Sequence, residues 1–151
     1  MNNTVHLSQD ESETLAIARQ LVGQCGGGKI VFALHGDLGA GKTRFAQGVA
    51  QALGVTEAVC SPTFAIAQEY RGDTGKRLIH FDLYRLSGEQ AVDDFGFEEM
   101  LARADIAVIE WPDRAGRLLP SDALHVTISF GETEMERRVR TSGARGRDAL
   151  P

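Results

Sequence analysis

The sequence predicts a three-layer α/β domain with a mixed β-sheet, in which antiparallel hairpins extend a parallel core. Three observations carry this prediction. The nearly continuous apolar run KIVFALH at 29–35 is typical of a strand covered on both faces. The glycine-rich stretch GDLGAGKT at 36–43 leads from this strand into a helical pattern. Two apolar runs at 64–70 and 77–85 are separated by the turn residues RGDTGK, which indicates an antiparallel hairpin.

The chain before the first apolar run predicts a strand followed by a helix. TVHL at 4–7 has the composition of a short strand. Ser8-Gln9-Asp10-Glu11 has the spacing of a capping box, in which the Glu11 side chain reaches back to the cap. Apolar residues at helical spacing follow, so we expect a helix over about 9–23. The glycines of GQCGGGK at 23–29 end it.

The remaining elements follow from the same patterns. A second helix begins near Lys42 and ends before Gly54, which occupies the position after a helix C-cap. Alternating apolar and polar residues predict half-exposed strands, and continuous apolar runs predict buried ones. The sequence then predicts these segments in order: a loop at 55–63, the hairpin strands at 64–70 and 77–85, one broken or two short helices at 87–103, a buried strand at 104–112, and paired strands at 123–130 and 134–140.

Length and composition limit the class of protein. The 151 residues fit one domain, which we place at 1–141, with 142–151 as a disordered tail. The net charge of −5 disfavours a main role in gripping nucleic acid, so we expect any RNA contact to be indirect or local. Two isolated cysteines fit a reducing compartment. No apolar run approaches the ~20 residues that span a bilayer, and the first residues do not resemble a signal peptide. We therefore expect a cytoplasmic protein without a membrane partner.

The segment Gly36-x-x-x-x-Gly41-Lys42-Thr43 matches the full Walker A pattern. It follows a buried strand and precedes a helix, which is the context that the phosphate-binding loop of P-loop NTPases requires. In such a loop, backbone N–H groups and a helix N-terminus surround the phosphates. Lys42 supplies a positive charge to the β and γ phosphates, and the Thr43 hydroxyl is placed to bind Mg²⁺. The alternative is a glycine-rich turn without a ligand.

ATP is the expected nucleotide. A GTPase needs an N-K-x-D motif to read guanine, but the only asparagines are Asn2 and Asn3, ahead of the loop. Asp93-Asp94-Phe95-Gly96 contains D-F-G, and His80-Phe81-Asp82-Leu83 resembles H-R-D-L, two motifs of protein kinases. A protein kinase is nevertheless excluded, because the chain is too short and its phosphate loop is of the Walker A type.

Two carboxylates at the ends of apolar strands compete for the magnesium-binding role. Asp82 follows the run LIHF, and Glu110 follows IAVI. A carboxylate at the carboxyl end of a strand beside the phosphate loop can hold Mg²⁺ directly or through water. One of the two would anchor the metal and the other would orient the attacking water, and the sequence leaves open which does which. His35 and His80 have no partner at ligand spacing, and we interpret the histidines as structural.

The segments GDLGAGKT, SPTF at 61–64, HFDLYRL at 80–86 and IEWP at 109–112, in this order and spacing, resemble the bacterial TsaE (YjeE) family. The resemblance covers about residues 8–130. Members of this family are single-domain P-loop ATPases of tRNA threonylcarbamoyladenosine biosynthesis. They act with the TsaB and TsaD proteins, which transfer a threonylcarbamoyl group to adenosine 37 of the tRNA. The resemblance implies that ATP turnover resets this complex, and that tRNA is contacted only through it.

The resemblance also implies roles for single residues. The segment Leu38-Gly39-Ala40-Gly41-Lys42-Thr43 would hold the phosphates, with Thr43 and Glu110 as magnesium ligands. Asp82 would be needed for hydrolysis. The segment Ser61-Pro62-Thr63 would act as a switch near the γ-phosphate, and Glu11 would lie near the base. Beside Glu110, Trp111 completes the predicted nucleotide site, and the predicted catalytic residues are Lys42, Asp82 and Glu110.

Two other functions fit the motif alone. A small-molecule kinase on a P-loop scaffold needs an acceptor pocket and an arginine-bearing lid. Little of the chain is left for either, and we expect Arg71, Arg77 and Arg85 to face solvent or a partner. A nucleotide-binding module without turnover is the third possibility.

Overall fold

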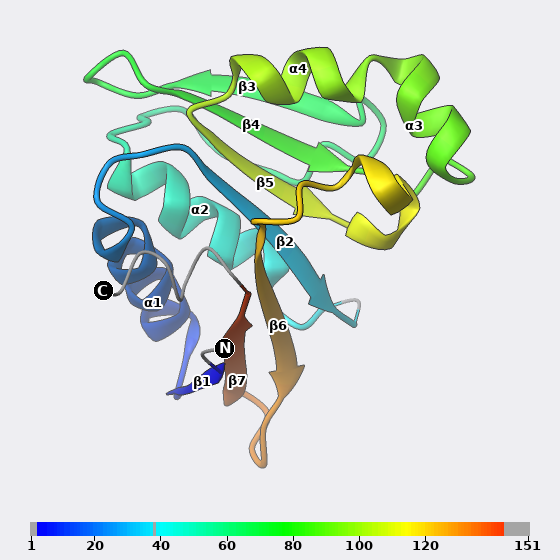
Figure 1. Cartoon of the computed structure of the whole chain (residues 1–151). Helices are drawn as coiled ribbons and strands as arrows, with labels where there is room; N and C mark the ends of the chain where they lie inside the picture. The colour runs from blue at the N-terminus through cyan, green and yellow to red at the C-terminus, as the bar shows by residue number, and fades with distance from the viewer. Residues whose placement is uncertain (1–2, 38, 144–151) are drawn as a thin grey trace.

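In residues 3–37 and 39–143, which the computed structural model describes, seven strands form one mixed sheet in the order β1-β7-β6-β2-β5-β4-β3 (Figure 1). The central strand β2 (Ile30–Gly36) pairs in parallel with β5 (Ile106–Glu110) and β6 (Leu124–Phe130), and β5 pairs in parallel with β4 (Arg77–Asp82). This is the predicted parallel core.

Antiparallel strands extend this core at both ends. β3 (Ala67–Arg71) pairs with β4 on one side. On the other side β7 (Arg137–Ser142) pairs with β6, and β1 (Asn3–Ser8) pairs with β7. The predicted mixed P-loop NTPase-like sheet is therefore confirmed. Ser142, the first residue of the expected tail, ends β7, and the tail from 144 onward lies outside the described residues, as does Leu38.

Helices cover both faces of the sheet and complete the three layers (Figure 1). α1 (Glu11–Gln24) and α2 (Lys42–Ala52) pack on one face. α3 (Glu89–Phe95), α4 (Phe97–Arg103) and a short 3₁₀ helix, η1 (Pro112–Leu118), pack on the other. The sequence did not predict η1. None of the helices in the described residues is long and apolar enough to cross a membrane.

The side chains of β2 show why the core strand has a continuous apolar run. Phe32 and Leu34 pack into the core beneath α1 and α2, whereas Val31 and Ala33 pack into the core beneath α3 and α4. Successive strand residues point to opposite faces, so a strand covered on both sides needs apolar residues at every position.

The start of α1 differs from the prediction. Asp10 is the N-cap, and its side chain accepts a hydrogen bond from the Glu13 backbone N–H at 3.1 Å. Glu13 reaches back to accept from the Gln9 N–H. The capping pattern therefore begins two residues later than predicted, because Ser8 is still part of β1 and its hydroxyl bonds to the backbone of Asp10 and to Thr14.

The hairpin strands are shorter than predicted. Residues 64–66 form a turn instead of the start of β3, because the Ile66 N–H donates to the Pro62 carbonyl at 2.7 Å and Ile66 adopts a positive φ of 70°. β4 ends at Asp82, whose Oδ1 accepts from the Tyr84 N–H at 3.1 Å. Both endings place polar groups of the turn and the strand end beside the Walker A loop.

Candidate nucleotide site

The Walker A loop connects β2 to α2 through backbone conformations that favour glycine. Gly36 has φ 152°, and a Cβ at this position would lie 2.5 Å from the Ile128 carbonyl oxygen on β6. Gly41 precedes α2 with φ 112°. Larger residues would push the loop away from β6 or strain its backbone. Arg137 on β7 donates from Nε to the Ala40 carbonyl at 3.1 Å, a contact across the sheet that holds the loop and that the sequence did not predict.

Lys42 lies at the first turn of α2 and is 7 % exposed. Its Nζ donates to the Gly36 carbonyl at 2.9 Å and lies 4.7 Å from the centroid of the Trp111 ring. The ammonium group therefore sits inside the loop, at a helix N-terminus whose N–H groups carry partial positive charge. Both features favour an anion at this position.

Asp82 and Glu110 meet beside this loop. They are register partners at the carboxyl ends of the parallel strands β4 and β5, and each is 4 % exposed. The Ser61 hydroxyl lies 3.0 Å from Asp82 Oδ2 and 3.4 Å from Glu110 Oε2. The Thr63 hydroxyl donates to the same Asp82 oxygen at 3.2 Å. The segment Ser61-Pro62-Thr63 is therefore hydrogen-bonded to the carboxylates.

His80 contacts Glu110, although the sequence analysis predicted only a structural role for this histidine. Its side chain is fully buried, and its Nε2 lies 2.7 Å from Glu110 Oε2. Nδ1 is buried and has no hydrogen-bond partner in the described part of the chain. The ring hydrogen therefore belongs on Nε2, where it is donated to the carboxylate. His80 and Asp82 are two positions apart in β4 and so lie on the same face of the strand, which was the signal available in the sequence.

Trp111 occupies an unusual backbone conformation beside Glu110. Its φ of 58° lies in the left-handed region, which costs of order 1–3 kcal/mol for a residue other than glycine. Its ring lies 4.9 Å from that of Tyr84, centroid to centroid, and 5.9 Å from the Arg114 guanidinium carbon. Such strain is typical of functional sites, where surrounding contacts hold an unfavourable conformation.

A cavity of about 780 Å³ joins these groups. This volume lies within the range of small-molecule sites. The predicted site residues that line it are Glu11, Gly39, Gly41, Lys42, Thr43, Thr63, Asp82, Glu110 and Trp111, together with Ser61 of the predicted switch. Four residues outside the predicted site set also line it: Asp37, Arg44, Gln47 and Tyr84.

Two predicted site residues are not among the residues that line the cavity. Ala40 is fully buried in the core, and its N–H closes a turn with the Asp37 carbonyl at 3.0 Å. Leu38 lies outside the described residues. Glu11 does reach the cavity wall, because Arg44 of α2 forms an ion pair with it. This pairing joins α1 to α2, and no spacing in the sequence predicts it.

The candidate metal ligands of this site, the two carboxylates and the Thr43 hydroxyl, are oxygen atoms. Within residues 3–37 and 39–143, no three histidine, cysteine or acidic side chains are grouped so that they could hold a metal ion by themselves. Two carboxylates and the Thr43 hydroxyl suit a hard cation such as Mg²⁺, which usually takes few protein ligands and completes its shell with water and phosphate oxygens.

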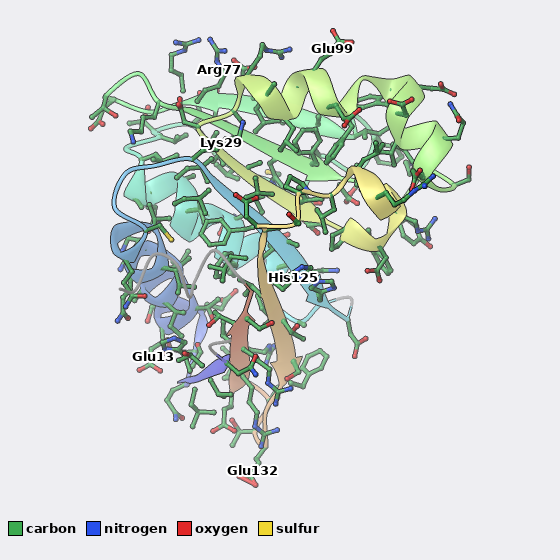
Figure 2. The ribbon with its side chains drawn as sticks, viewed as in Figure 1. Glu13, Lys29, Arg77, Glu99, His125 and Glu132 are labelled. Atoms are coloured by element: carbon green, nitrogen blue, oxygen red, sulfur yellow. The ribbon has the colours of Figure 1, made fainter. Side chains whose placement is uncertain are left out.

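A pair of histidines joins β2 to β6, with His125 near the start of β6 (Figure 2). His35 Nε2 and His125 Nδ1 are 2.9 Å apart, and the two rings are stacked. Burial lowers the pKa of His35, and the neighbouring His125 lowers it further, whereas Asp113 acts in the opposite direction. The pair lies on β2 and β6, outside the set of residues that line the 780 Å³ cavity.

Comparison with known proteins assigns the family. Residues 8–139 match the family model described as threonylcarbamoyl adenosine biosynthesis protein TsaE. The chain is 38 % identical to the Bacillus subtilis tRNA threonylcarbamoyladenosine biosynthesis protein TsaE over 82 % of this chain and 77 % of that protein. It is 41 % identical to the protein of the same name from Aquifex aeolicus over 70 % and 74 % of the two chains.

A solved structure supports the same assignment. The crystal structure of Bacillus subtilis YdiB superposes with a TM-score of 0.75 and 31 % sequence identity, covering 98 % of this chain and 91 % of that one. The match extends across the mixed sheet and both helical layers, so the fold and the sequence point to one family. The chain belongs to the TsaE family of tRNA threonylcarbamoyladenosine biosynthesis proteins.

Proposed function

We propose that this chain is a P-loop ATPase that binds and hydrolyses Mg-ATP to support modification of adenosine 37 in tRNA. The observation that carries the proposal is the meeting of Lys42, Asp82 and Glu110 in one cavity. These residues lie far apart in the sequence, yet the cavity brings a buried cation, two buried carboxylates and a helix N-terminus together.

The phosphates of ATP would lie in the Walker A loop. Nζ of Lys42 already points at a loop carbonyl, so it can exchange this neutral acceptor for phosphate oxygens. A charge-assisted hydrogen bond in a partly desolvated site is stronger than one to a carbonyl. Glu11 and Arg44, which line the same cavity, are the residues we place nearest the base and sugar.

Thr43 and Glu110 would hold Mg²⁺, and the ion would neutralise charge on the phosphates. His80 and Ser61 both contact Glu110 at Oε2, so these contacts orient the carboxylate from one side. Asp82 would then orient the attacking water. In the present arrangement Ser61 and Thr63 contact its Oδ2, and its Oδ1 accepts from the Tyr84 N–H. A water would therefore bind at the remaining acceptor site of Oδ1 or displace one of the two hydroxyls.

The biological setting follows from the family. Relatives are named as proteins of tRNA threonylcarbamoyladenosine biosynthesis. We propose that this chain acts with TsaB- and TsaD-type proteins, does not itself transfer the threonylcarbamoyl group, and contacts tRNA only through the complex. A lone P-loop without an arginine finger hydrolyses slowly, and partners can raise its turnover by roughly 10³–10⁵ where they supply or order the missing groups.

The test is a steady-state ATPase assay with and without the TsaB–TsaD pair, together with a count of modified tRNA formed per complex. We expect weak activity alone and faster turnover with the pair. Unchanged ATPase activity, or sustained modification when this chain is omitted, would refute the proposed role. Transfer of phosphate to an added small-molecule acceptor would instead support the kinase alternative.

A further inference from the structure

Phe64 has the largest exposed fraction of the large apolar side chains in the described residues. It is 85 % exposed, compared with 54 % for Val5, the next in order. Burying a phenylalanine side chain is worth about 1.5–3 kcal/mol relative to leaving it in water. Aromatic side chains are common among the residues that dominate binding energy at interfaces, so a ring this exposed is a candidate anchor for a partner.

The exposure of Phe64 does not come from a loose loop. The turn that carries it is closed by the hydrogen bond from Ile66 N to the Pro62 carbonyl at 2.7 Å. The end of the turn is fixed to β4, because the Asp82 N–H donates to the Ile66 carbonyl at 2.7 Å. The Arg85 guanidinium carbon lies 4.7 Å from the centroid of the Phe64 ring. The ring is therefore presented in a defined position.

Arginine side chains lie over two exposed aromatic rings, Phe64 and Tyr84. Besides Arg85, Arg114 lies 5.6 Å from the centroid of the half-exposed Tyr84 ring, measured from its guanidinium carbon. In the described part of the chain, the ion pairs of arginine with carboxylates involve other arginines. Arg114 donates to the Leu86 carbonyl at 2.9 Å, so Arg85 is the arginine whose charge we expect a partner to meet, although the chain as a whole carries −5.

We propose that Phe64, Arg85 and Tyr84 form the docking surface for a partner protein that offers an apolar pocket rimmed by carboxylates. This inference rests on the proposed function, since it names how the partner would contact the nucleotide site. A protein is favoured over RNA because the acidic chain would repel a phosphate backbone, whereas an aromatic anchor beside one arginine fits the usual core and rim of a protein interface.

The same turn joins this surface to the cavity. Thr63, the residue before Phe64, donates to Asp82 Oδ2, and Ser61 contacts both carboxylates. A ligand that takes up these carboxylate oxygens competes with the two hydroxyls. Binding of a ligand in the cavity therefore changes the hydrogen bonds that position Phe64. A partner that binds the Phe64 ring can then distinguish the nucleotide-bound protein from the empty protein.

The chain supplies a matched control. Phe130 on β6 is also an exposed phenylalanine, 47 % exposed, with the Arg137 guanidinium carbon 4.7 Å from its ring centroid. It has the same arginine-over-ring contact. Phe64, however, directly follows Thr63, which lines the cavity, whereas neither chain neighbour of Phe130 lines it. Phe64→Ala and Phe130→Ala therefore remove the same side chain from two comparable surfaces.

The experiment measures the affinity of each variant for the purified TsaB–TsaD pair in the presence of Mg-ATP, and separately the affinity for ATP. We expect Phe64→Ala to weaken partner binding by at least about 30-fold, as for an aromatic hot spot, while ATP affinity stays within about 2-fold. Arg85→Glu should also weaken partner binding, and Phe130→Ala should leave it unchanged.

Equal partner affinity of the two alanine variants would overturn the proposal. Loss of ATP affinity in Phe64→Ala would also overturn it, because the ring would then act inside the cavity. If Phe64→Ala lost binding to a tRNA but still bound the TsaB–TsaD pair, the occupant of this surface would be RNA and the proposal would be wrong. Failure of the unaltered protein to bind the pair, with ATP still bound, would refute the partner assignment in the proposed function as well.

Discussion

Asp82 and Glu110 are opposite each other in the register of β4 and β5, and one serine hydroxyl lies within 3.4 Å of both carboxylates. A hydroxyl has a single hydrogen, so Ser61 can donate to only one of them at a time. Two buried carboxylates side by side repel each other, and a nearby cation relieves that repulsion. The arrangement supports the proposed division of roles, in which Glu110 binds magnesium and Asp82 orients the attacking water.

Lys42→Ala should abolish the stabilisation of the protein by Mg-ATP. The buried Lys42 ammonium group is the positive charge that we expect to contact the phosphates, and alanine cannot replace it. At an ATP concentration of 100 times Kd, the unaltered protein should gain about 2.7 kcal/mol of unfolding free energy. Thermal unfolding with and without Mg-ATP measures the difference. Equal shifts in the two proteins would remove Lys42 from the site.

Glu110→Gln should weaken magnesium-dependent nucleotide binding, because the amide keeps the shape of the side chain but loses the charge that binds the ion. Trp111 is the only tryptophan and lies next to Glu110, so its fluorescence can follow the titration. Asp82→Asn is the matched control and should bind Mg-ATP as the unaltered protein does. A flat fluorescence titration of the unaltered protein, or unchanged magnesium dependence in Glu110→Gln, would count against this placement.

His80→Phe should raise the magnesium concentration needed for half-maximal ATP binding by about 10–100-fold, the usual effect of removing a group that orients a metal ligand. His80→Gln, whose amide N–H can reach Glu110 from the same distance along the side chain, should restore most of the affinity. ATP binding measured without magnesium should be the same in all three proteins. A stability defect in both variants with unchanged magnesium dependence would leave His80 a purely structural residue.

The stability of the protein should depend on His35 in acid. Burial and the neighbouring His125 lower the pKa of His35 below its ordinary value of 6.5. The unfolded chain therefore binds a proton at a higher pH than the folded chain, and the unfolding free energy falls as the pH drops from 6.5 through the lowered pKa. Urea unfolding from about pH 7.5 to about pH 5.5 should show a shallower decline for His35→Gln than for the unaltered protein. Parallel curves would show that His35 does not contribute.

Much of the fold follows from local patterns in the sequence. The apolar run of β2, the turn between β3 and β4 and the helical spacing of α2 each depend on neighbours in the chain, and the structure confirms all three. The prediction of a strand at 64–66 was wrong. The apolar residues there are typical of a strand, but hydrogen bonds with Pro62 and Asp82 hold the segment as a turn. Tertiary contacts outweigh strand propensity there.

The parts of the candidate site that could be predicted are those formed by a sequence motif or by the end of a strand. Walker A glycines, Lys42 and the two strand-end carboxylates have fixed positions relative to local elements, so pattern alone finds them. Contacts such as Glu11 with Arg44 or His80 with Glu110 join residues that are 33 and 30 positions apart. Only the packing of α1 on α2 brings Glu11 to Arg44, and no sequence pattern predicts it. Alternation along β4 places His80 on the same face as Asp82, but the register of β4 on β5 is needed to bring it to Glu110.

The most direct test of the account is the release of inorganic phosphate from saturating Mg-ATP by the unaltered protein and by Asp82→Asn, with the TsaB–TsaD pair present. We predict that the unaltered protein releases phosphate and ADP in equal amounts. We predict that Asp82→Asn binds Mg-ATP but releases phosphate about 10²–10⁴-fold more slowly, the loss expected when a group that orients or deprotonates the attacking water is removed. Phosphate release at the same rate in both proteins would contradict the assignment of this cavity as an ATP-hydrolysing site.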